Sequence, residues 1–185
     1  MPASTYWFDF DPGGEPDRIV HSGKFNWTYV LGSALMDPLY RGTTVIAHEE
    51  GHGLNVRYGT GNGGDGMGEG NGDVWALYVY DYPINGEDFF LSGGDIRTGT
   101  NLRQFCGDCS PGCYGEVHAD GEVWMGAAWK VRVNLNTTLG NTLGDLTADS
   151  LFMGWMNGFD QTQIRSVIEL QWLLLEGPEG FIGHL

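Results

Sequence analysis

The chain of 185 residues has the length of one domain and does not need a second core. Its formal net charge of −15 argues against a nucleic-acid backbone or an anionic membrane surface as partner, because both would repel it. It contains no apolar run of about 18 residues that would serve as a membrane span.

Residues 1–42 have the pattern of a short β-rich leader. Aromatic and polar residues alternate over 6–10 and again over 25–29, on either side of a proline-glycine turn, as in short strands. Residues 1–10 lack the basic and apolar regions of a secretory signal. We therefore expect either that precursor segments have been removed or that the chain is a fragment.

A helix is predicted from about Thr43 to Arg57, and it carries an H-E-x-x-H motif at His48, Glu49 and His52. Two histidines four residues apart lie on one face of a helix, with Cβ atoms roughly 5–6 Å apart, so both imidazoles reach one tetrahedral ion. The motif predicts a zinc site in which Glu49 takes a proton from water on the ion. The alternative is an accidental match on a solvated helix.

A glycine-rich loop leads into a second predicted helix over Met67–Tyr80. Glu69 and Asp73 stand four residues apart in it and therefore share a face. A catalytic zinc needs a third protein ligand and leaves its fourth position open. The glycine-aspartate repeats at 63–66 and 70–73 are also similar to a calcium-binding β-roll, but such repeats need several stacked copies to bury a core.

The motif H-E-x-x-H-G at 48–53, followed by G-x-G-E-G-x-x-D at 66–73, resembles the fungalysin branch of the thermolysin-like zinc metallopeptidases, the gluzincins. The resemblance implies three zinc ligands, which are His48, His52 and Glu69. It also implies that Asp73 accepts a hydrogen bond from a ligand imidazole, that of His48, and so orients it.

This chain differs from the usual family pattern at two places. It has Glu50-Gly51 between the motif glutamate and histidine, and Asn71 after G-E-G. Because a glycine inside a helix costs roughly 1 kcal/mol relative to alanine, we expect a locally weaker active-site helix. The family also binds extended substrate along an edge strand, for which residues 24–30 are the candidate; a strand that only covers the core is the alternative.

Residues 81–116 are polar and rich in glycine, which predicts a long loop. Residues 85–88 and 94–97 resemble the segment in which a thermolysin-like arginine binds the substrate carbonyl beyond the scissile bond. Arg97 is therefore the candidate substrate clamp, and a surface arginine paired with an acid is the alternative. Glu87 and Asp88 fall near positions that bind calcium in some relatives, which makes Ca²⁺ a second candidate cofactor.

The same loop contains Cys106, Cys109 and Cys113. A structural zinc site usually needs four ligands, and no fourth is visible nearby. We prefer one disulfide within the loop and one free thiol; three free thiols are the alternative.

The segment from Val117 to Trp124 is similar to the family's V-H-x-x-G-E-V-W, whose histidine donates a hydrogen bond to the tetrahedral intermediate. The resemblance gives that role to His118; the alternative is a capping or core histidine. Apolar spacing predicts helices over 121–135, Leu146–Met156 and Thr162–Leu175, the last with Asp160 as N-cap. Trp124 and Trp129 are expected in the core.

The sequence thus predicts one α+β, mainly helical domain over residues 1–185, with a thermolysin-like catalytic lobe. Its parts are the leader (1–42), the zinc-binding helices (43–80), the glycine-rich loop with the cysteines (81–116) and a helical C-terminal lobe (117–185).

The expected function is a secreted, extracellular zinc endopeptidase in which Glu49 is the general base. We expect a monomer that acts on protein or peptide substrates and is made with a pro-segment. The alternative is an inactive or truncated homologue that retains structural zinc as a binding module.

Overall fold

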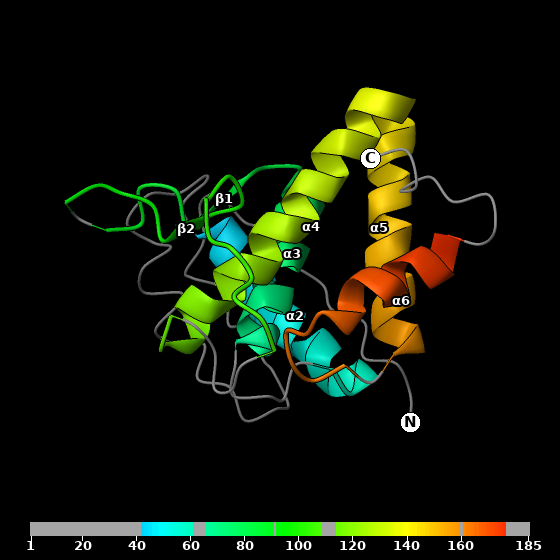
Figure 1. Ribbon diagram of the computed structural model, residues 1–185. Helices are drawn as coiled ribbons and strands as arrows, with labels where there is room; N and C mark the ends of the chain where they lie inside the picture. Colours follow the sequence, from blue (N-terminus) through cyan, green and yellow to red (C-terminus); the bar gives the residue numbers. More distant parts are fainter. Residues whose placement is uncertain (1–41, 61–65, 91, 109–113, 160, 177–185) are drawn as a thin grey trace, which may run out of the picture.

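The computed structural model describes residues 42–60, 66–90, 92–108, 114–159 and 161–176. These residues form five helices and one two-stranded sheet (Figure 1): α2 (Thr43–Tyr58), α3 (Met67–Tyr80), β1 (Ile84–Asn85), β2 (Arg97–Thr98), α4 (Val117–Leu139), α5 (Asn141–Gly158) and α6 (Val167–Glu176). The described part of the chain is mainly helical, as the sequence predicts. The predicted leader, with the candidate edge strand at 24–30, lies outside the described residues.

The helices pack against one another in chain order. α2 packs on α3, α3 on α4 and α4 on α5, and α6 lies across α5 (Figure 1). The sheet is antiparallel, with Ile84 opposite Thr98 and Asn85 opposite Arg97, and it contacts α2, α3 and α4. The sheet therefore joins the two predicted zinc-binding helices to the helix that carries His118. None of the helices in the described ranges is both long and apolar enough to cross a membrane.

The core lies between α3, α4, α5 and α6 and is rich in aromatic rings. The ring of Trp124 lies 5.1 Å from that of Trp155 and 5.3 Å from that of Trp172, measured between centroids. Trp124 is buried, as predicted, and Trp129 packs half-buried against the same cluster. Because Trp124 comes from the first turns of α4, the core supports the part of that helix nearest His118.

α4 begins at Val117, four residues before the predicted start. Glu116 is its N-cap, and one of its carboxylate oxygens accepts hydrogen bonds from the backbone N–H groups of His118 and Ala119. This capping satisfies donors that would otherwise have no partner at a helix start. The earlier start places His118 inside the first helical turn rather than ahead of it.

α6 begins at Val167, five residues after the predicted start at Thr162, and the predicted N-cap Asp160 lies outside the described residues. The carboxylate of Asp108 accepts hydrogen bonds from the backbone N–H and the hydroxyl of Ser166, at 2.8 and 2.9 Å. A residue 58 positions away in the sequence thus satisfies the donors at the start of this helix.

The loop that carries Asp108 also contains the cysteines. Cys106 is disulfide-bonded, which agrees with the prediction of a disulfide in this loop. Cys109 and Cys113 lie outside the described residues.

Candidate metal centre

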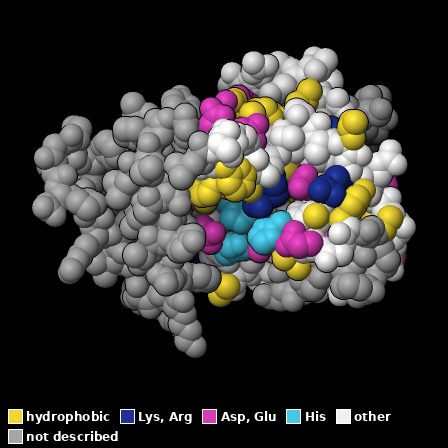
Figure 2. Space-filling view, turned by 90° about the vertical axis from the view of Figure 1, so that its left-hand side faces the viewer, with side chains coloured by type: hydrophobic (Ala, Val, Ile, Leu, Met, Phe, Trp, Pro, Cys, Tyr) yellow, Lys and Arg dark blue, Asp and Glu magenta, His cyan; other side chains and the backbone are white. Residues whose placement is uncertain are grey.

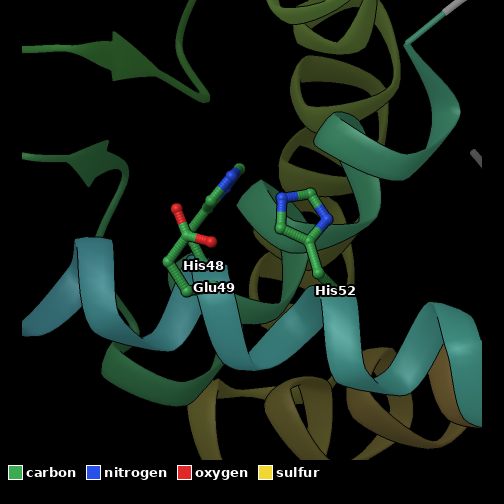
Figure 3. A group of neighbouring side chains, drawn as sticks. All are labelled: His48, Glu49 and His52. Atoms are coloured by element: carbon green, nitrogen blue, oxygen red, sulfur yellow. The ribbon is translucent and has the colours of Figure 1, made fainter. Parts of the chain in front are cut away.

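Helix α2 presents both histidines of the motif to one side. The imidazole centroids of His48 and His52 lie 4.8 Å apart with their planes nearly perpendicular, at 85°. Figure 3 shows that Glu49 rises from the same side of the helix as the two rings. One ligand atom from each of these three residues lies within 4.8 Å of the others. The spacing of the motif therefore gives the convergence of side chains that it predicts.

Helix α3 brings Glu69 to the same place. Its Oε2 lies 3.2 Å from Nε2 of His48, and its Oε1 lies 3.7 Å from Nε2 of His52. Two atoms that bind one tetrahedral zinc ion at about 2.0–2.1 Å lie about 3.3 Å apart. The separations between Glu69 and the two imidazoles therefore fit ligands that share one ion.

A buried atom of Glu69 supports this interpretation. Oε2 is shielded from solvent and has no hydrogen-bond partner among the described residues, although an imidazole nitrogen lies 3.2 Å away. Proximity without hydrogen-bond geometry is expected when two lone pairs point to a common ion instead of to each other. Since an unsatisfied buried carboxylate oxygen is costly, a cation at this point is the natural partner.

Two carboxylates compete for the position of third ligand. Glu49 and Glu69 both lie near the histidines, but each oxygen of Glu69 faces a different imidazole. Glu69 comes from a second helix and bridges the two rings, which fits a ligand. Glu49, next to His48 in the chain, then lies beside the group without being needed as its third ligand.

Asp73 anchors His48 from the side away from Glu69. Nδ1 of His48 donates to Oδ1 of Asp73 over 2.8 Å, which leaves Nε2 of the same ring as the nitrogen that faces Glu69. Asp73 is fully buried and also accepts from Asn85 and Arg97. A ligand imidazole that donates its second N–H to a carboxylate is the usual arrangement in metal sites.

The pKa values of His48, Glu69 and Asp73 depend on one another, because each side chain lies beside another charged one. Burial raises the pKa of Asp73, but the hydrogen bond from His48 and the charges of His48 and Arg97 outweigh it and lower the pKa to about 2. Burial lowers the pKa of His48, but its hydrogen bond to Asp73 and the nearby carboxylate of Glu69 raise it to about 9. The pKa of Glu69 is raised by burial and lowered more strongly by the surrounding imidazoles. A metal ion bound by these residues would therefore compete with protons for the same atoms.

Arg97 lies within this group and not on an open surface. Its Nε and Nη2 donate to the two oxygens of Asp73 over 2.7 and 2.9 Å, and the side chain is 10 % exposed. Arg97 is thus paired with an acid, as in the alternative prediction of a surface ion pair. The acid is Asp73, however, which also binds His48. The role of Arg97 as a substrate clamp stays a prediction.

His118 stands at the outer edge of the centre. Its Nε2 lies 3.2 Å from Oε2 of Glu69, and its Nδ1 lies 2.5 Å from Oε1 of Glu116. The hydrogen bond with His118 lowers the pKa of Glu116 to about 2. The side chain of His118 is 47 % exposed, so a substrate group can approach it from solvent. Figure 2 shows histidines gathered on one face with acidic and basic side chains beside them.

A close crossing of α2 and α3 explains Gly51. A Cβ atom on Gly51 would lie 2.6 Å from Cα of Gly72, and one on Gly72 would lie 2.9 Å from Nδ1 of His48. The two helices approach to a distance that only glycine permits. The expected weakness of the helix at Gly51 is therefore offset by the contact that brings Asp73 within reach of His48.

Asn71, the other departure from the family pattern, is a buried connector of three helices. It donates to Oδ1 of Asn55 on α2 over 2.9 Å and accepts from Nε1 of Trp124 on α4 over 2.8 Å. An aromatic residue at this position would break both hydrogen bonds and leave buried groups unpaired. Sequence reasoning did not identify this network, since its members are far apart in the chain.

The residues proposed for calcium do not join the metal-binding group of the described chain. Glu87 accepts from the hydroxyl of Tyr82, and Asp88 accepts from the backbone N–H of Gly94. In the described ranges, the side chains grouped so that they could hold a metal ion are those of His48, Glu49 and His52 on α2. Calcium binding stays a prediction.

Comparisons of the chain with models of known families, with curated proteins and with solved structures found no match. The resemblance to gluzincins therefore rests on the motifs, and the site is interpreted from its own geometry.

Proposed function

We propose that this chain is a zinc-dependent endopeptidase of the thermolysin-like type. One observation carries the proposal: the buried Oε2 of Glu69 has no hydrogen-bond partner among the described residues, yet it lies 3.2 Å from Nε2 of His48. Nε2 of His52 faces the other oxygen of the same carboxylate. Two imidazoles and one carboxylate are the ligand set of many catalytic zinc sites, in which the fourth position is open.

In this proposal, His48, His52 and Glu69 hold the ion. Bound zinc supplies Lewis acidity, which makes water a nucleophile near neutral pH and stabilises negative charge on a carbonyl oxygen. Glu49 takes the proton from the water that attacks the peptide carbonyl. It then transfers this proton to the amine that leaves when the C–N bond breaks.

His118 acts on the carbonyl oxygen of the substrate. Its Nδ1 is bound to Glu116, which leaves Nε2 as the nitrogen that faces the centre. From the exposed edge of the site, the doubly protonated imidazole donates its Nε2–H to the oxygen as negative charge develops on it, while its Nδ1–H stays on Glu116. His118 would in this way add to the stabilisation of charge that bound zinc would supply.

The expected substrates are extended segments of proteins, and the expected location is extracellular. The disulfide at Cys106 supports an oxidising compartment, where such bonds persist. The net charge of −15 is compatible with a soluble, monomeric secreted enzyme.

The test is Glu49→Gln, assayed on casein at equal zinc occupancy. Glutamine has nearly the same shape but does not accept the proton, so turnover should fall by the ~10²–10⁴-fold attributed to a positioned base. Zinc content and fold should not change. The matched control is Glu50→Gln, which alters the exposed neighbour on the same helix and should leave turnover unchanged.

Two results would count against the proposal. Equal turnover by parent and Glu49→Gln would remove Glu49 from the mechanism. If the zinc-loaded parent shows no turnover that a chelator abolishes, the chain is instead an inactive homologue that retains the metal as a structural or binding module.

A further inference from the structure

We propose that Asn85 is a positioning residue of the metal centre, which holds Asp73 in the orientation that makes His48 bind metal through Nε2. The inference rests on the proposed zinc site and deepens it. Asn85 lies in β1 and makes no described hydrogen bond to a candidate ligand, and the family comparison that includes residues 85–88 gives it no role.

The sheet places Asn85 at the centre. Asn85 is paired with Arg97 across the two strands, and both side chains donate to Asp73. Nδ2 of Asn85 lies 2.7 Å from Oδ1, the same oxygen that accepts from His48. The next residue, Gly86, donates its backbone N–H to the hydroxyl of Thr44 over 2.9 Å and so fixes β1 to the start of α2.

Asn85 holds the carboxylate of Asp73 near His48, whereas Arg97 alone would draw it away. Arg97 makes two hydrogen bonds to Asp73, and its Nη2 also approaches Nδ1 of His48 to 3.5 Å. Without another donor, the carboxylate would follow the guanidinium, and its bond to His48 would lengthen. The amide of Asn85 is short and fixed by the strand, and it binds the oxygen that His48 uses. It therefore keeps this oxygen in line with the Nδ1–H of the ring.

Stability alone does not account for an amide at this position. Asn85 is 1 % exposed, and its Oδ1 has no hydrogen-bond partner in the described part of the chain. A buried acceptor without a partner destabilises the folded state, whereas a leucine of similar size has no such atom. The amide of Asn85 therefore contributes through its Nδ2–H, which donates to Asp73.

The experiment uses Asn85→Leu in the full chain. Zinc affinity is measured by competition with a chromogenic chelator, and the Nδ1–H of His48 is followed by NMR in the zinc-loaded protein. We expect affinity to fall by about 10-fold, at the low end for residues outside the ligand shell. The Nδ1–H signal should shift upfield and lose its protection from exchange. The melting temperature of the metal-free variant should be equal to that of the parent or higher.

The matched control is Asn101→Leu. Asn101 is attached to the same sheet, since its Nδ2 donates to the carbonyls of Thr98 and Glu122, but none of its described contacts is with Asp73. This variant should melt at a lower temperature and keep its zinc affinity and its His48 signal. If Asn85→Leu does not fold, Asn85→Ala removes the same donor without adding bulk and should show the same loss of affinity.

The outcomes separate this inference from the proposed function. A parent that binds no zinc overturns both. If the parent binds zinc and the Asn85 variants match it in affinity and in the His48 signal, the inference alone is wrong. It is also wrong if Asn85→Leu and Asn101→Leu lose stability and affinity in parallel. A zinc-binding parent that is inactive on casein overturns the peptidase but not the role of Asn85.

Discussion

His118 is the candidate catalytic residue whose position in the structure is most open to solvent. We predict that His118→Ala lowers kcat by about 10²–10³ with little change in KM, because its hydrogen bond strengthens only as charge develops on the carbonyl oxygen. Steady-state kinetics on a peptide substrate measure both constants. Zinc content should stay at the parent value.

A different result is equally informative, since Nε2 of His118 lies as close to Oε2 of Glu69 as Nε2 of His48 does, at 3.2 Å. Loss of zinc from His118→Ala would make His118 a ligand. The role of Glu69 as third ligand would then have to be revised.

At the scale of single residues, the sequence predicted which side chains share a helix face, because a separation of four residues determines this. The four-residue separations of His48 from His52 and of Glu69 from Asp73 each specify a shared helix face, and the structure has them so. It gave no role to Asn85, which stands in the segment 85–88 compared with the family, or to Glu116, which directly precedes the V-H-x-x-G-E-V-W segment. Asn85 becomes part of the site only through pairing of the chain across 12 positions.

At the scale of elements, α2 and α3 were predicted nearly to the residue. Glycines stand at both ends of α2 and before the start of α3, whereas Asp81 is the C-cap of α3. The starts of α4 and α6 were misplaced because side chains determine them: the N-cap at Glu116 and the distant carboxylate of Asp108. The start of α5 was also wrong, since the helix begins at Asn141 and not at the predicted Leu146. The two-residue strands of the sheet were missed altogether. Strands that short have no periodicity, and tertiary contacts hold them in place.

Two glycines of α2 give a paired test of the helix crossing. A Cβ at Gly51 would meet the backbone of Gly72 at 2.6 Å, whereas a Cβ at Gly53 would meet nothing within 4 Å. We predict that Gly51→Ala destabilises the fold by about 1–3 kcal/mol, because the helices must separate. Gly53→Ala should stabilise it by roughly 0.5–1 kcal/mol, because alanine favours the helix. Urea unfolding of the metal-free proteins measures both.

The metal affinities of the two variants complete this test. Separation of α2 from α3 would move Asp73 away from His48, so Gly51→Ala should also bind zinc more weakly, while Gly53→Ala should not. Two variants of equal stability would show that the crossing is not as close as described.

At the scale of the whole molecule, the ion pair between His48 and Asp73 links the stability of the metal-free fold to pH. The pKa of Asp73 is about 2 in the fold against an ordinary 3.8, so its contribution is present above pH 3.8 and is lost as pH falls through 2. The pKa of His48 is about 9 against an ordinary 6.5, so its contribution is present below pH 6.5 and is lost as pH rises through 9. The loss of stability at low pH and the loss at high pH both come from the same ion pair, so the two contributions to the free energy of unfolding do not add.

We therefore predict that the metal-free protein is most stable between about pH 4 and 6.5 and loses stability on either side of this window. Asp73→Asn removes the pair and should flatten both limits, which melting temperatures measured from pH 3 to 9 would reveal. Zinc should act in the opposite sense: because it must displace the proton of His48, its stabilising effect should grow as pH rises. If Asp73→Asn keeps the pH profile of the parent, the stability of the fold does not depend on this pair. If zinc stabilises the parent equally at pH 6 and pH 8, metal and proton do not share the imidazole.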